Sequence, residues 1–129
     1  AVANYESPSI PGTKIKSGES LTLELQRTPD IAAWAGHHRS ENHVLVGFTA
    51  ESTDLLETAR VKLFDKKLDL VCANDMGTPG TGFNGSQNQV ILLDGKDIEL
   101  TSPLTSKFAV ACWIWEQVLQ WRQGRDNKS

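Results

Sequence analysis

Two lysines, Lys62 and Lys66, stand four residues apart in a segment with helical periodicity, which places their side chains on one stripe of a helix. Two more, Lys14 and Lys16, lie in a segment rich in proline and glycine. Compact ammonium groups neutralise phosphates, so one interpretation is a phosphate site with a closing flap. The other is a set of solvated charges, with Lys62 and Lys66 favoured by the helix dipole. The residues themselves leave both open.

Glycines and histidines add two further candidates. Gly80–Gly85 matches G-x-G-x-x-G, but that fingerprint must follow a strand tightly and open a helix, and this segment runs into another strand. We therefore reject a dinucleotide site and disfavour a dinucleotide-dependent oxidoreductase. His37, His38 and His43 share no helical face and have no Cys-x-x-Cys pair, so we expect no metal site.

These side chains need a scaffold, and residues 44–75 predict one, a strand–helix–strand crossover. Residues 44–46 and 70–73 are unbroken apolar runs, as expected of parallel strands buried on both faces. Between them, apolar residues recur at helical spacing after a cap at Thr53 or Asp54, with a capping-box glutamate three residues beyond Asp54. Ligands of such crossovers bind at the carboxyl ends of the strands, here expected at Gly47-Phe48-Thr49 and Asn74-Asp75.

Other elements are predicted around this crossover. Alternating leucines at 21–25 indicate a strand with one wet face, at a sheet edge or in a dimer. Thr28-Pro29-Asp30 begins a short helix, and Gly36 ends it. Residues 89–93 indicate another strand, which Asp94-Gly95 turns into a hairpin.

A last helix is expected to begin at Ser102-Pro103 and to pack across the sheet. Trp113 and Trp121 fall off its apolar stripe, which predicts that they are half exposed or lie in an interface. The stripe itself consists of Leu104, Phe108, Ala111, Cys112, Trp115, Val118 and Leu119.

The length of 129 residues suits a single domain, and a formal charge of −3 argues against a general nucleic-acid binder. No apolar run is long enough for a membrane span. Cys72 and Cys112 are expected as buried thiols, which predicts a cytoplasmic protein. The chain starts at Ala1 without methionine, in the apparent end of a core strand, so we interpret it as part of a longer protein. Residues 1–20 form a predicted flexible flap region.

Short motifs follow one another along nearly the whole chain: Lys14-Ile15-Lys16, Thr28-Pro29-Asp30-Ile31, Val46-Gly47-Phe48-Thr49-Ala50-Glu51, Lys62-Leu63-x-x-Lys66, Leu68-Asp69-Leu70-Val71-Cys72-Ala73-Asn74-Asp75 and Gly82-Phe83-Asn84. As an ordered set they resemble the C-terminal half of bacterial phosphopantothenoylcysteine synthetase, the ligase portion of the bifunctional coenzyme A biosynthesis flavoprotein.

This resemblance implies an α/β, Rossmann-like three-layer fold with a mostly parallel sheet, plus a C-terminal hairpin and helix, in a homodimer. It implies a carbon–nitrogen ligase that joins 4′-phosphopantothenate to cysteine with CTP and Mg²⁺ through an acyl-cytidylate. The flavin belongs to the decarboxylase portion and is not expected here. The family's glycine-rich first half lies upstream of Ala1, so this chain alone is expected to be inactive. A non-catalytic nucleotide-binding or dimerisation module is the alternative.

The resemblance also implies a nucleotide site. Phe48 would pack at the cytidine. Lys14, Lys62 and Lys66 would face the triphosphate, and Lys14 would also be catalytic. Asn4 stands where the family has a carboxylate, and Ser17 where the flap has a further lysine, so contacts at these positions should differ. The implied nucleotide-binding residues are Asn4, Lys14, Pro29, Asp30, Ile31, Ala32, Phe48, Lys62 and Lys66.

Overall fold

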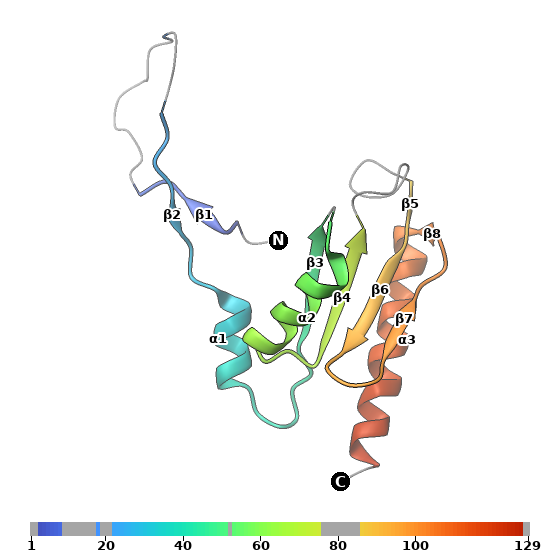
Figure 1. Ribbon diagram of the computed structural model, residues 1–129. Coiled ribbons are helices and arrows are strands. Elements are labelled where there is room, and N and C mark those ends of the chain that lie inside the picture. Colours follow the sequence, from blue (N-terminus) through green and yellow to red (C-terminus); the bar gives the residue numbers. More distant parts are fainter. Residues whose placement is uncertain (1–2, 9–17, 19–21, 52, 76–85, 128–129) are drawn as a thin grey trace. The chain divides into compact units, whose positions relative to one another are not determined.

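The computed structural model describes residues 3–8, 18, 22–51, 53–75 and 86–127 (Figure 1). The chain divides into two compact units, Ala1–Ile31 and Ala32–Ser129, which are described separately. Lys14, Lys16, Ser17 and most of the predicted flap lie outside the described residues, as does the Gly80–Gly85 motif.

The first unit is built on a short antiparallel ladder between β1 (Tyr5–Glu6) and β2 (Gln26–Arg27). The Thr28 backbone N–H extends it by donating to the Asn4 carbonyl oxygen at 3.0 Å. The predicted core strand ending at Tyr5 is wrong, because Tyr5 is exposed on this two-residue strand. The predicted strand at 21–25 is likewise wrong over its described part, and the strand begins only at Gln26.

The predicted crossover is confirmed in the second unit. It consists of β3 (Val46–Glu51), α2 (Leu55–Asp65) and β4 (Leu70–Asp75), with β3 and β4 parallel and Val46 opposite Leu70. The first strand is shifted relative to the prediction, because β3 starts at Val46 and runs on to Glu51. Asp54 precedes α2 as expected, but its backbone is left-handed and its side chain makes no cap, so the capping box is wrong.

The central sheet is mixed. Its strand order is β3-β4-β6-β7, in which β6 (Val90–Asp94) pairs antiparallel with both β4 and β7 (Glu99–Thr101). The α/β class and the C-terminal hairpin are confirmed, but the sheet is not mostly parallel within the described strands. A hairpin reverses the chain without a helical crossover, which makes β6 and β7 antiparallel to their neighbours. A second ladder joins β5 (Gln87–Asn88) to β8 (Thr105–Ser106).

Helices cover both faces of this sheet, which gives the predicted three layers (Figure 1). On one face, Ala59 and Leu63 of α2 pack against Val71, Ala73 and Leu93. On the other face, α3 (Lys107–Asp126) contributes Val110 and Val118, which pack against Leu70, Cys72 and Leu92. Each fully buried leucine or valine contributes about 1.5–3 kcal/mol of transfer free energy.

The face that α3 turns to the sheet differs from the prediction. The expected stripe is largely exposed, with Phe108 at 80% and Trp115 at 65% of their maximal surface. Trp113 and Trp121 are partly exposed, as predicted, and pack against the core. The helix also begins later, with Ser106 as its cap, whose hydroxyl accepts from the Ala109 N–H at 3.2 Å. Two adjacent apolar stripes run along α3, and helical periodicity does not say which one meets the sheet.

One glycine acts through close packing. The helix α1 (Ile31–His38) runs through Gly36, which therefore does not end it as predicted. A Cβ at Gly36 would collide with the backbone carbonyl of Lys66, at the end of α2. Absence of a side chain thus lets α1 lie directly against the turn between α2 and β4.

Asp69 anchors the segment that leads into β3. Its carboxylate pairs with Arg39 and accepts the Leu45 N–H at 2.8 Å, and Arg125 of α3 donates to the Glu41 carbonyl at 2.8 Å. These contacts fix the start of β3 against β4. Within the described ranges, no helix combines the length and apolar composition needed to cross a bilayer.

Candidate functional site

Lys62, Thr49 and Glu51 form a hydrogen-bonded triangle. The Lys62 ammonium donates to Thr49 Oγ1 at 2.5 Å and to Glu51 Oε1 at 2.8 Å. The Thr49 hydroxyl in turn donates to the same Glu51 oxygen at 3.0 Å. Glu51 is the last residue of β3, so the triangle places a cation near the carboxyl end of a parallel strand. Ligands of crossover folds bind at such ends.

The crossover itself produces this arrangement. Thr49 and Glu51 are two residues apart on β3 and therefore point to the same face of the sheet. Lys62 lies in the last turn of α2, which runs back along β3, and helical side chains lean toward the helix N-terminus. The long lysine side chain consequently extends toward the end of β3.

The triangle is partly desolvated and electrostatically coupled. The hydrogen bond from Lys62, followed by that from Thr49, lowers the pKa of the Glu51 carboxyl below its ordinary value. The side chains of Lys62 and Glu51 remain 36% and 33% exposed. A lysine ammonium has three N–H donors, of which two are directed at Thr49 and Glu51.

Glu51 was not among the residues expected to form the site, and Thr49 was expected only as part of the strand end Gly47-Phe48-Thr49. Apolar and polar residues alternate from Phe48 to Glu51, which would place Thr49 and Glu51 on one face of a strand. This pattern is informative only if the strand extends to Glu51. With the strand predicted at residues 44–46, Glu51 fell in a loop, where alternation has no meaning.

Lys66 lies one helical turn beyond Lys62. It forms the C-cap of α2, where its backbone N–H donates to the Lys62 carbonyl at 3.1 Å, and its own carbonyl lies against Gly36. The structure therefore places the Lys66 backbone one turn farther than that of Lys62 from the carboxyl end of β3. A shared role of both lysines at a triphosphate stays a prediction.

Phe48 lies on the opposite face of β3 from the triangle. It is paired with Cys72, a member of the core beneath α3, and its ring is 70% exposed. Thr49 and Glu51 point to the α2 face because residues alternate along a strand. Since β3 is an edge among the described strands, one ligand can contact Phe48 and Lys62 only by passing around that edge.

The remaining predicted residues belong to the first unit or to its boundary. Asn4 lies beside Thr28 through the backbone hydrogen bond described above, so the ladder brings Asn4 close to Pro29. Pro29, Asp30, Ile31 and Ala32 are all exposed, around the start of α1. Lys14 lies outside the described residues.

The histidines are engaged locally. His37 and His38 have Nδ1 atoms 2.8 Å from the carbonyls of Ala33 and Trp34, one turn back, and His38 stacks on Trp34. Among the described residues, no group of three His, Cys, Asp or Glu side chains is placed to hold a metal ion.

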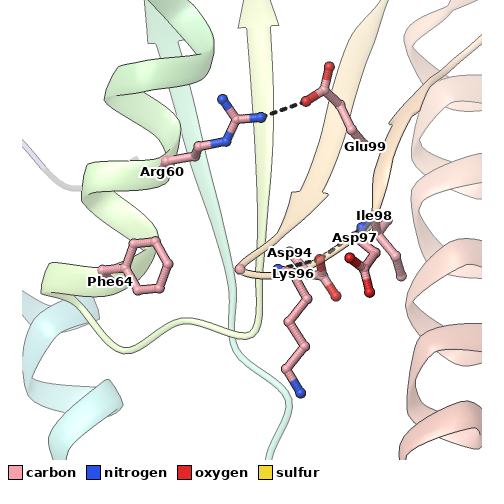
Figure 2. Close-up of a pocket in the computed structure, with 8 residues that line it drawn as sticks. Arg60, Phe64, Asp94, Lys96, Asp97, Ile98 and Glu99 are labelled. Carbon is pink, nitrogen blue, oxygen red and sulfur yellow. Dashed lines mark hydrogen bonds and ion pairs between the residues drawn. The ribbon is translucent and has the colours of Figure 1, made fainter.

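A shallow pocket of about 140 Å³ lies elsewhere, between α2 and the β6–β7 turn (Figure 2). Figure 2 shows Arg60 reaching across it to Glu99, with an Nη2 to Oε2 distance of 2.7 Å. A larger groove of about 920 Å³ adjoins the turn and includes Trp121. Neither hollow is lined by Phe48, Lys62 or Lys66. We place the candidate site at the Lys62 triangle instead, because the triangle lies near the carboxyl end of the parallel strand β3.

Comparisons with a family model and with curated proteins match this chain to the same family. The family model of the DNA/pantothenate metabolism flavoprotein C-terminal domain matches residues 1–121. The coenzyme A biosynthesis bifunctional protein CoaBC of Vibrio cholerae is 40% identical over 114 residues, which cover 86% of this chain and 28% of that protein. Its counterpart in Escherichia coli is 38% identical over 123 residues, with 92% and 30% covered.

The fold is similar to that of a solved relative. The crystal structure of the C-terminal domain of a coenzyme A biosynthesis bifunctional protein CoaBC superposes with a TM-score of 0.64 at 30% identity. The match covers 81% of this chain and 46% of that chain. The chain thus spans about half of the solved domain and less than a third of the two curated relatives.

Proposed function

Because the chain belongs to the DNA/pantothenate metabolism flavoprotein C-terminal domain family, we propose that it is the nucleotide-binding part of a CTP-dependent ligase. Its homology to CoaBC proteins connects it to coenzyme A biosynthesis. The proposed reaction joins 4′-phosphopantothenate to cysteine through an acyl-cytidylate, and the activity resides in the longer protein that carries this chain.

The observation that carries this proposal is the position of Lys62. A polyanion such as a nucleoside triphosphate needs compact cations, and the Lys62 ammonium is held near the carboxyl end of β3 with part of its surface open to solvent. Family membership supports the substrate class, and the triangle supports the location of the phosphates.

In the first step of the proposed reaction, a carboxylate oxygen of 4′-phosphopantothenate attacks the α-phosphorus of CTP. A bond forms between these atoms, the bond to the bridging oxygen breaks, and pyrophosphate leaves with the electron pair. Lys62 would stabilise the negative charge that grows on the leaving group. The cysteine amine then attacks the acyl carbon, loses a proton and expels CMP. Lys14 and Lys66 are proposed as further phosphate contacts.

Mg²⁺ would enter this site together with the triphosphate. Mg²⁺ in nucleotide sites is held largely by substrate phosphates, with one or two carboxylates. The described residues fit that pattern better than a closed protein cage, because they contain no cluster of three candidate ligands. When bound, the ion neutralises part of the phosphate charge, and the protein's own cation near β3 is Lys62.

A second candidate function is self-association without catalysis. The exposed apolar side chains of Tyr5, Leu23 and Leu25 in the first unit favour it, because exposed apolar surface often marks an interface. A homodimer is also part of the first proposal. Sedimentation of the wild type and of a Leu23→Ser, Leu25→Ser variant tests the interface. Calorimetry with CTP then separates the two functions, since a dimer that lacks CTP affinity supports association alone.

The test of the first proposal uses the full-length ligase that contains this chain. With CTP, Mg²⁺ and 4′-phosphopantothenate, it should release pyrophosphate before any cysteine is added, and cysteine should then release CMP. Lys62→Ala should strongly reduce pyrophosphate release. Lys96→Ala, which removes an exposed lysine in the β6–β7 turn, is the charge-matched control. Pyrophosphate release that requires no phosphopantothenate, or that Lys62→Ala leaves intact, would contradict the proposal.

A further inference from the structure

The Lys62 ammonium is held in a defined direction. Lysine side chains normally rotate about several bonds, and fixing one in a site costs conformational entropy. Here two of the three ammonium donors are directed inward, at Thr49 and Glu51. Among the described residues the third donor meets no acceptor, and the side chain is 36% exposed, so an external acceptor can reach it.

We propose that Thr49 and Glu51 are positioning residues of the phosphate site, which hold Lys62 through two hydrogen bonds while its third N–H binds a phosphate oxygen. This inference rests on the proposed function and deepens it. Lys62 therefore keeps its contacts with Thr49 and Glu51 when the anion binds.

The connectivity of the triangle supports this role. The buried Thr49 hydroxyl accepts from Lys62 and donates to Glu51, so its single proton is already committed and its rotation is fixed. If Lys62 left the triangle, Thr49 would lose a donor in a buried position, which is unfavourable.

The charges support it as well. Lys62 and Glu51 together are neutral, so the pair by itself is a weak long-range attractor for an anion. A carboxylate this close to a phosphate would repel it, and that repulsion lowers affinity. Glu51 and Thr49 offset this loss by fixing the direction of the third Lys62 N–H before the anion binds. Such preorganised donors are most effective where negative charge develops during a reaction.

Thr49 gives the sharper test because its substitution changes no charge. In the full-length ligase, Thr49→Val keeps the shape and removes the hydroxyl, and Thr49→Ser retains the hydroxyl. Binding of inorganic pyrophosphate with Mg²⁺, measured by calorimetry, should weaken about tenfold in Thr49→Val, which corresponds to one lost hydrogen bond to a charged group. Thr49→Ser should bind within about twofold of the wild type. Thermal unfolding of both variants checks that they fold.

A second measurement follows Glu51 directly. Carbon-13 carboxyl spectra of labelled ligase report the Glu51 titration, and Lys62→Met assigns its resonance by raising the midpoint. The pKa of Glu51 should lie below its ordinary value in the free protein, since Lys62 and Thr49 donate to it. The pKa should rise toward its ordinary value in Thr49→Val, because one of the two donors to Glu51 is then lost.

The outcomes separate this inference from the function on which it rests. If pyrophosphate binds and Lys62→Met abolishes binding, but Thr49→Val binds like the wild type, Thr49 is no positioning residue and the inference fails alone. It also fails alone if Thr49→Val leaves the pKa of Glu51 in the free ligase unchanged, since Thr49 then does not hold Glu51 in the triangle. If the wild-type ligase binds neither pyrophosphate nor CTP, both the proposed function and this inference fail.

Discussion

The Lys62 ammonium lies 2.8 Å from Oε1 of Glu51, which joins the last turn of α2 to the last residue of β3. A partly exposed ion pair of this kind contributes little to stability in solution. The ion pair instead acts by positioning, because it fixes the Lys62 ammonium near the carboxyl end of β3, where a crossover fold binds its ligand.

Replacement of Lys62 by alanine should weaken CTP binding to the full-length ligase by about 1–3 kcal/mol, as expected for a lost charge-assisted contact. Lys66→Ala should have an effect in the same range if both lysines contact the triphosphate. Lys96→Ala should leave affinity unchanged and serves as the control. Calorimetry at low salt measures all three, and unaltered affinity in both site variants would favour the interpretation of solvated helix charges.

Gly36→Ala should destabilise the chain by about 1–3 kcal/mol, because the new methyl group would collide with the Lys66 carbonyl and force α1 away from α2. Gly124→Ala is the matched control on a second helix, where a Cβ meets nothing within 4 Å. That change should stabilise the chain by about 0.4–1 kcal/mol. Urea unfolding of the two variants tests the contrast, and equal effects would show that α1 does not rest on this turn.

The two cysteines should react differently in the native chain. Both are free, and Cys72 is buried in β4 as expected. The expected burial of Cys112 is wrong, because this residue is exposed on α3. A thiol reagent at pH 8 should modify Cys112 rapidly and Cys72 only after unfolding, since buried thiols are inert. Mass spectrometry of the labelled wild type and of Cys112→Ser checks this. Rapid native labelling of Cys112→Ser would mean that β4 is less protected than described.

Cys72 also predicts a loss of stability in alkaline solution. Burial raises its pKa from 9.0 to about 12, so the thiol stays protonated in the folded chain while it ionises in the unfolded chain. The stabilisation is fully present below the unfolded pKa and declines as pH rises toward the folded value, by about 1.4 kcal/mol per pH unit. Denaturant unfolding at pH 8 and 10 should show a smaller decline in Cys72→Ala than in Cys112→Ser.

Neighbouring residues on α3 test which face meets the sheet. Val118→Ala should cost about 1–3 kcal/mol because Val118 packs in the core, whereas Leu119→Ala should cost less than about 1 kcal/mol because Leu119 is partly exposed. Thermal or urea unfolding of both variants measures the difference. The reverse order would contradict the packing of Val118 against the sheet.

The crossover and the hairpin were predictable because their signals are local. Unbroken apolar runs mark the strands at 70–73 and 90–93, and the pair Asp94-Gly95 marks the turn. Helical spacing of apolar residues located α2 with its start at Asp54 correctly placed. Lys62 could also be singled out, since its spacing from Lys66 and its place on a helix are properties of the chain itself.

The sequence alone therefore determined the main elements, their helical or extended type and the cation of the candidate site, because these follow from periodicity over a few residues. Tertiary structure decided which stripe of α3 faces the sheet, why Gly36 lacks a side chain and which partners hold Lys62. Each of these depends on an element distant in sequence and on its orientation. A residue pattern specifies the faces that an element offers, and only packing selects the one that is used.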